Sequence, residues 1–152
     1  MKLAEALLIR SDRQKKLAQL KGRIRNNAKV QEGDIPSEDP NELIVSASQI
    51  ISELTGLIER IHRTNAIAKT DKGQSMLTLL VERDTLEMRH KLLIDAIEAA
   101  NSEADRYSHR EIKWHVLVSV ASLQKQADDI AMKLRQINII IQSNNWQIDL
   151  VD

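Results

Sequence analysis

Two Glu-x-x-His motifs are the residues of this sequence most able to do chemistry: Glu59 with His62, and Glu87 with His90. Residues three apart share a face of a helix, so a carboxylate and an imidazole at this spacing could hold one metal ion together. Carboxylate-bridged di-iron bundles use the motif twice, with one glutamate from each of the two remaining helices. The pattern therefore raises a metal-binding helical bundle as one alternative function.

The glutamates needed to complete such a centre are not all present, because residues 119–145, the last predicted helix, contain no glutamate. Glu59 and His62 also lie near Ser52 and Thr55, on the polar face of their predicted helix. Motifs this short occur often by chance in helices rich in glutamate. We therefore expect these four residues to be solvent-facing, and we expect no metal and no cofactor.

Two charged residues interrupt the apolar positions of their helices: Arg10 in the first predicted helix and Asp84 in the third. A buried charge needs a partner, and pairs of this kind more often fix the register of packing than do chemistry. We expect Arg10 and Asp84 to form a structural polar cluster.

The first 31 residues carry nine Lys or Arg against two acidic residues, a net charge of +7. A basic helix can neutralise phosphates, so a nucleic-acid-associated protein is a second alternative. Residues 32–42 follow with five acidic residues and no basic one, and no aromatic residues lie among the basic ones to stack on bases. We expect the acidic segment to lie against basic residues such as Arg23, Arg25 and Lys29, and nucleic acid not to be the main partner.

Long helices must position all of these residues, because only four Gly and two Pro interrupt the chain. Apolar residues recur every seven positions from Leu43, from Leu79 and from Val120, as they do in packed amphipathic helices. Asp39 and Pro40 suit the N-cap and first residue of a helix. The sequence predicts an all-α fold: one helical domain, an elongated bundle with helices at about 2–31, 40–68, 75–102 and 119–145.

The composition excludes several classes of protein. The net charge is zero and there is no cysteine, so a disulfide framework and a thiolate nucleophile are ruled out. No run approaches the ~18 apolar residues of a membrane span, and the N-terminal segment is too charged for a signal peptide. No nucleophile elbow or phosphate-binding glycine loop is present. We expect a cytoplasmic protein with no membrane partner, and nothing in the sequence indicates an enzyme or a particular small-molecule ligand.

Several segments together resemble one family: "LAEALLIRSDRQKKLAQLKGRI", "NAKVQEGDIPSEDPNEL", "ERDTL", "RYSHREIKW" and "LQKQADDIAMKLRQI" with "IQSNNW". The family consists of small helical bacterial proteins of unknown function, some of them labelled septicolysin-like. The resemblance covers nearly the whole chain and implies a helical core and an oligomer, without an established activity. A pore-forming role does not follow from these residues, since a pore former needs a membrane-inserting segment.

The segment before the last helix has a different pattern from the rest. Apolar and polar residues alternate through "EIKWHVLVSV", which favours a short extended or strand segment near residues 110–118. Four-residue spacing of Ile112, Val116 and Val120 leaves a helical alternative open. A lone strand needs a partner for its backbone, and the same segment of a second subunit about a two-fold axis would supply one.

The sequence therefore predicts an oligomeric helical scaffold or interaction protein whose main partner is itself. The predicted interface residues are Tyr107, Ile112, Trp114, Val116 and Val118.

Overall fold

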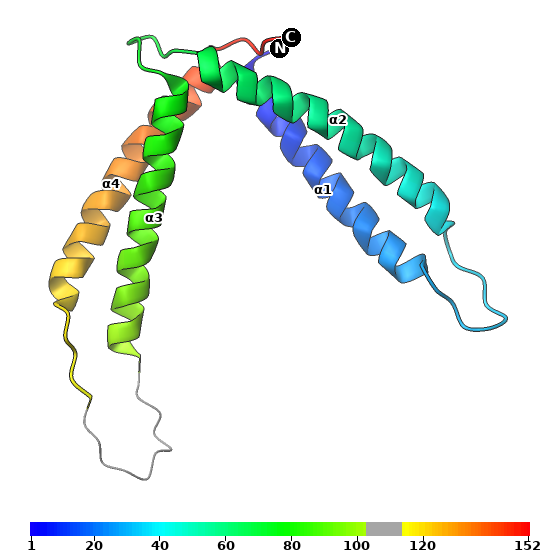
Figure 1. Cartoon of the computed structure of the whole chain (residues 1–152), viewed down its shortest axis with the longest axis horizontal. Coiled ribbons are helices and arrows are strands. Elements are labelled where there is room, and N and C mark those ends of the chain that lie inside the picture. Colours follow the sequence, from blue (N-terminus) through cyan, green and yellow to red (C-terminus); the bar gives the residue numbers. More distant parts are fainter. Residues whose placement is uncertain (103–113) are drawn as a thin grey trace. The chain divides into compact units, whose positions relative to one another are not determined.

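The computed structural model describes residues 1–102 and 114–152, and helices make up 74% of these residues. The chain order is α1 (Leu3–Asn27), α2 (Pro40–Ile67), α3 (Met76–Asn101) and α4 (Val120–Asn145) (Figure 1). The predicted all-α fold is confirmed. Three of the four helices agree with the predicted bounds to within one residue at each end, and α1 is the exception.

Helix α1 ends at Asn27, four residues before the predicted end, because the side chain of Asn27 supports a loop instead. The amide nitrogen of Asn27 donates to the carbonyl of Arg23 at 2.9 Å. Its side-chain oxygen accepts hydrogen bonds from the hydroxyl of Ser37 at 3.3 Å and from the backbone N–H of Glu38 at 3.2 Å. One buried side chain thus holds the loop between α1 and α2, in which Gly33 adopts a φ of 91°.

Helix α2 begins as the sequence predicts, with Asp39 as N-cap and Pro40 as its first residue. The carboxylate of Asp39 accepts a hydrogen bond from the backbone N–H of Asn41 at 2.8 Å. The predicted seven-residue repeat forms the buried face of this helix, whose core residues are Leu43, Ala47, Ile50, Leu54 and Ile61.

The described chain divides into two compact units. Unit 1 contains residues 1–76 and 143–152, and in it α1 packs along α2. One cluster of buried residues lies at the loop end of this pair, built on Leu20, Leu43, Ala47 and Ile50. A second cluster joins both ends of the chain to α2, through Leu3, Ala6, Ile61 and Leu150.

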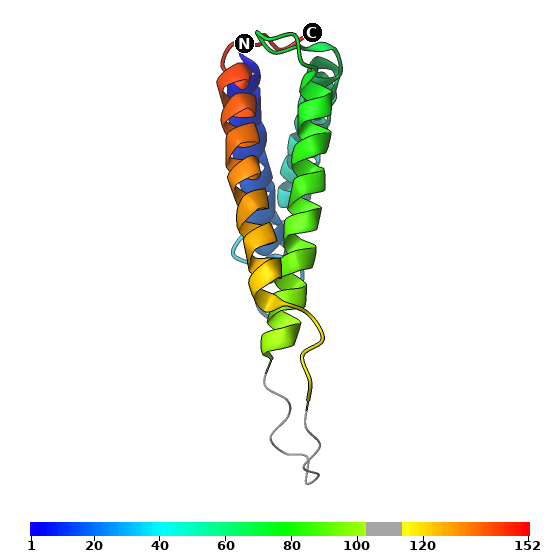
Figure 2. The ribbon, with the colours of Figure 1, turned by 90° about the vertical axis from the view of Figure 1, so that its left-hand side faces the viewer.

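Unit 2 contains residues 77–142, in which α3 and α4 run side by side in both views (Figures 1 and 2). The apolar positions predicted for these helices include their buried residues Leu79, Ile97, Ala127, Ile137 and Ile141, while Leu86, Leu93 and Ala100 of the α3 repeat are half-buried. The hydroxyl of Ser119 accepts a hydrogen bond from the backbone N–H of Ser122 at 3.4 Å, so Ser119 caps α4.

The predicted strand before α4 is not present in its described part. Residues 114–119 form a connection with neither strand nor helix, and residues 110–113 lie outside the described residues. Alternating valines favour a strand locally, but a strand requires a hydrogen-bonding neighbour. The described chain contains only two isolated bridges, between Lys2 and Asp149 and between Lys69 and Ser75. Within the described ranges, no helix is long and apolar enough to cross a membrane.

Candidate functional site

Among the described residues of unit 2, the connection, residues 114–119, holds four large exposed apolar side chains in close succession. The exposed fraction is 81% for Trp114, 59% for Val116, 94% for Leu117 and 45% for Val118. Soluble proteins rarely leave large apolar side chains exposed in succession unless the patch is a contact surface. Three of the five predicted interface residues therefore lie on an exposed apolar surface, while Tyr107 and Ile112 lie outside the described residues.

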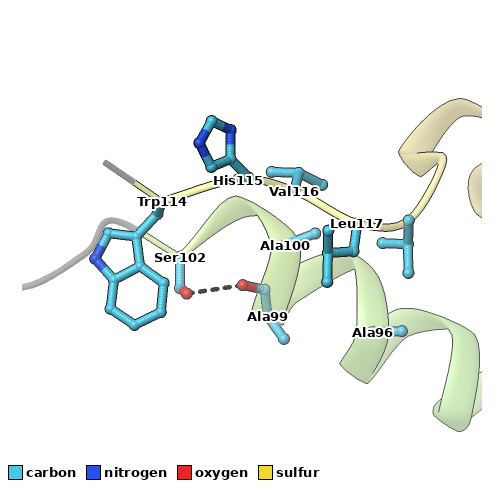
Figure 3. A pocket seen from close by; sticks show the side chains of 9 residues that line it. Ala96, Ala99, Ala100, Ser102, Trp114, His115, Val116 and Leu117 are labelled. Atoms are coloured by element: carbon cyan, nitrogen blue, oxygen red, sulfur yellow. Dashed lines mark hydrogen bonds between the residues drawn. The ribbon is translucent and has the colours of Figure 1, made fainter. Parts of the chain in front are cut away.

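The connection covers one side of a hollow of about 460 Å³ whose other side is the C-terminal end of α3 (Figure 3). The lining is almost entirely small or apolar. Helix α3 contributes Ala96, Ala99 and Ala100, and Ser102 follows directly after the helix. Trp114 and His115 project to opposite sides of the connection. The connection is therefore extended above a helix surface made of alanines, which lets apolar groups approach closely.

The polar groups of this hollow are few and do not form a reactive set. The hydroxyl of Ser102 donates a hydrogen bond to the carbonyl of Ala99 at 2.8 Å, and the imidazole of His115 is exposed. Among the hydrogen bonds of the described residues, none joins these two groups. Catalysis of acyl or phosphoryl transfer needs several polar groups directed at one reacting atom. The hollow is suited to apolar contact.

The four residues of the Glu-x-x-His motifs are divided between the two units: Glu59 and His62 lie on α2 in unit 1, and Glu87 and His90 on α3 in unit 2. Glu59, His62 and Glu87 are exposed and His90 is half-buried. Glu87 lies 3.8 Å from the guanidinium of Arg83. Across residues 1–102 and 114–152, no three His, Asp or Glu side chains come together as a metal site would require.

The predicted polar cluster of Arg10 and Asp84 also spans the two units, so its pairing stays a prediction. Arg10 is half-buried on α1. Asp84 is exposed, whereas the sequence placed it among the apolar positions of its helix. Its carboxylate accepts two hydrogen bonds from Arg83, at 3.0 and 2.6 Å. The ion pair observed at Asp84 is thus a local one with its chain neighbour.

The acidic segment does lie against the basic helix at one point. The guanidinium of Arg23 donates two hydrogen bonds to the carboxylate of Glu38, one of them at 2.9 Å. These hydrogen bonds lower the pKa of Glu38 and raise that of Arg23. A second cation of α1, Arg13, lies 3.0 Å from Glu53 of α2. Two of the basic residues of α1 are therefore paired inside unit 1, which reduces the charge available to a polyanion.

The sequence did not predict a set of polar contacts that join residues 146–152 to α2 within unit 1. Arg60 donates to the carbonyl of Val151 at 2.9 Å, and Arg63 donates to the carbonyl of Asp152 at 2.8 Å. The buried hydroxyl of Thr64 accepts a hydrogen bond from the backbone N–H of Val151 at 3.1 Å. Contacts between residues so far apart in the chain leave no periodic signal in the sequence.

Comparison with known proteins places the chain among proteins of unknown function. A crystal structure titled as a functionally unknown conserved protein from Corynebacterium diphtheriae is similar, with a TM-score of 0.81 and 35% sequence identity over 99% of each chain. Comparison with curated proteins found no match. The septicolysin-like label has no counterpart in these matches. The model of a family of unknown function, DUF6847, matches residues 10–150, and the chain belongs to this family.

Proposed function

We propose that this protein is a helical interaction protein that associates with further copies of itself through the connection. The observation that supports the proposal is the exposure of Trp114, Val116, Leu117 and Val118 in one short segment. Burial of a large apolar side chain contributes about 1.5–3 kcal/mol. Burial of four such side chains is therefore comparable with the estimated cost of association, about 4–15 kcal/mol.

The charge of the chain supports self-association. Lys plus Arg and Asp plus Glu are equal in number, so copies of the chain carry no net charge that would keep them apart. The hollow beside the connection also has few polar groups, so it offers no specific recognition of a charged ligand. The partner that best matches this hollow is an uncharged apolar surface on a second copy of the chain.

Sedimentation equilibrium of the wild type and of Leu117→Asp tests the proposal. Leu117 is 94% exposed, so a charge at this position leaves the folded chain intact and disfavours burial in an interface. We expect the wild type to be oligomeric at micromolar concentration and Leu117→Asp to be monomeric with an unchanged helical circular dichroism spectrum.

Ile35→Asp is the matched control, because Ile35 is 90% exposed but lies in the loop between α1 and α2, in the other unit. This variant should sediment as the wild type does. A monomeric wild type, or equal sedimentation of all three proteins as oligomers, would contradict the proposed function.

A further inference from the structure

Helix α3 has a second apolar face besides the one it buries in the fold. Leu79 and Ile97 mark the buried face. A separate set of small or apolar residues recurs at intervals of three or four along the helix, and we name it the outer α3 row: Leu77, Val81, Thr85, Met88, Leu92, Ala96 and Ala99. Its four large apolar residues are 49%, 57%, 66% and 69% exposed, in chain order.

The outer α3 row contains no charged residue over its whole length. Its one polar member, Thr85, donates its hydroxyl to the carbonyl of Val81 at 2.8 Å, so its hydrogen-bonding group is satisfied within the helix. The pattern repeats after eleven residues, which make three helical turns. The resulting 3.67 residues per turn is close to the natural period of an α-helix. The row therefore follows one face of a nearly straight helix, whereas solvent-facing helix surfaces usually carry charges.

The outer α3 row continues into the candidate site. Its last two members, Ala96 and Ala99, line the hollow beside the connection. Both belong to unit 2, so the row and the connection form one continuous apolar surface of that unit.

From this continuity we infer that a second copy of the chain packs along the outer α3 row, about a two-fold axis parallel to α3. This inference rests on the proposed function, because it extends the same interface. An axis along the helix brings each residue of the row next to its own counterpart, and it does the same for the connection. An axis across the middle of α3 would place the two connections at opposite ends of the helix pair.

The charges beside the row select the same axis. Successive residues of an α-helix are 100° apart around its axis, which places Asp84 on one side of the row and Arg89 on the other. An axis parallel to α3 brings opposite sides of the two rows together, so Asp84 faces Arg89 of the second copy. An axis across the middle of α3, between Met88 and Arg89, brings equal sides together, so Arg89 would meet Arg89 of the second copy instead of Asp84.

The length of the row explains why the connection has to take part. From Leu77 to Ala99 the helix rises about 33 Å, at 1.5 Å per residue. A contact of this length and one helix wide is small beside the ~800 Å² that each partner buries in a stable interface. The row and the exposed side chains of the connection therefore belong to one interface.

Cysteine cross-linking tests the inference directly, because the chain contains no cysteine. Val81→Cys and Met88→Cys place a thiol on the outer α3 row, while Glu82→Cys is an exposed control on another face of α3. Under mild oxidation, Val81→Cys and Met88→Cys should each give disulfide-linked dimers, and Glu82→Cys should remain monomeric on a denaturing gel. Circular dichroism checks that all three variants keep their helix.

Failure of the inference can be distinguished from failure of the proposed function. If the wild type sediments as an oligomer but neither row variant cross-links above the control, the outer α3 row is not in the interface. If Met88→Cys cross-links and Val81→Cys does not, or if only a mixture of the two variants cross-links, the axis runs across the helix and the inference is wrong. If the wild type is monomeric, the proposed function fails as well.

A charge exchange gives a second, independent measurement. Asp84→Arg would place two cations together in the inferred interface and should weaken dimerisation roughly tenfold or more. The double variant Asp84→Arg with Arg89→Asp restores opposite charges and should recover the affinity of the wild type in sedimentation equilibrium. A single variant that associates as the wild type does would overturn the inferred axis.

Discussion

The ammonium group of Lys2 lies 2.8 Å from the carboxylate of Asp149 and also donates to the carbonyl of Gln147 at 2.9 Å. Two backbone hydrogen bonds, from Leu3 to Ile148 and from Leu150 to Met1, join the same two segments at 2.9 Å each. The first helix and the C-terminal segment are thus fastened to each other by charge and by backbone pairing.

This ion pair predicts a dependence of stability on pH. The hydrogen bond from Lys2 lowers the pKa of Asp149. A carboxyl group whose pKa is lower in the folded state stabilises the fold above its unfolded pKa, near 3.9, and loses this contribution as the pH falls through its folded pKa. Between pH 7 and pH 3, we expect the melting temperature of Asp149→Asn to fall by less than that of the wild type.

Asp12→Asn, at an exposed position of α1, serves as the control for this comparison and should behave as the wild type does. Equal loss of melting temperature in Asp149→Asn and the wild type would show that the ion pair contributes nothing to the acid sensitivity of the fold.

The second core cluster predicts a large effect for a truncation in α2. Ile61 is 2% exposed and packs in the cluster that contains Leu3 and Leu150. Ile61→Ala should reduce the free energy of unfolding by about 2–5 kcal/mol, because it removes buried apolar area and leaves a cavity. Ile67→Ala, at an exposed position of the same helix, should change it by less than about 0.5 kcal/mol. Urea denaturation monitored by circular dichroism measures both, and similar values for the two variants would contradict the assigned core.

The hydroxyl of Thr64 provides a test of the C-terminal contacts. It donates to the carbonyl of Arg60 at 2.7 Å and accepts from Val151, at a position that is 1% exposed. Thr64→Val keeps the volume but leaves the N–H of the half-buried Val151 without this acceptor, which should cost about 0.5–1.5 kcal/mol of unfolding free energy.

Thr55→Val removes a hydroxyl that donates to the carbonyl of Ile51 at 2.8 Å on an exposed face of α2. This control should leave the unfolding free energy almost unchanged. Hydrogen exchange of the Val151 amide gives a second readout, since it should accelerate in Thr64→Val only.

Much of the fold could be predicted because it depends on periodic apolar positions and local caps. The row from Leu43 to Ile61 is buried as its spacing predicts, and Asp39 caps α2 through its own carboxylate. Both signals involve residues within one or two turns of each other. The end of α1 could not be predicted in this way, because Asn27 bonds to residues in a loop that has no regular pattern.

The candidate site was predicted only in part. The unusual composition around Trp114 and Val116 indicated an assembly surface, and these side chains are exposed and apolar. The described part of the segment is extended, as predicted, but it is not a strand. Alternation of apolar and polar residues is typical of a half-buried strand, but it does not supply a hydrogen-bonding partner. The outer α3 row was not predicted, because the repeat through Leu79 and Leu86 is the stronger apolar pattern in the same helix.

The central claim, that association buries the connection, is tested most directly by the fluorescence of Trp114. The chain has two tryptophans, both exposed in the described chain, so Trp146→Phe leaves Trp114 as the sole indole emitter. We predict emission that is blue-shifted and protected from acrylamide at micromolar concentration, and that shifts to the red with faster quenching on dilution. Emission typical of a solvated indole at every concentration, with quenching independent of dilution, would contradict the account.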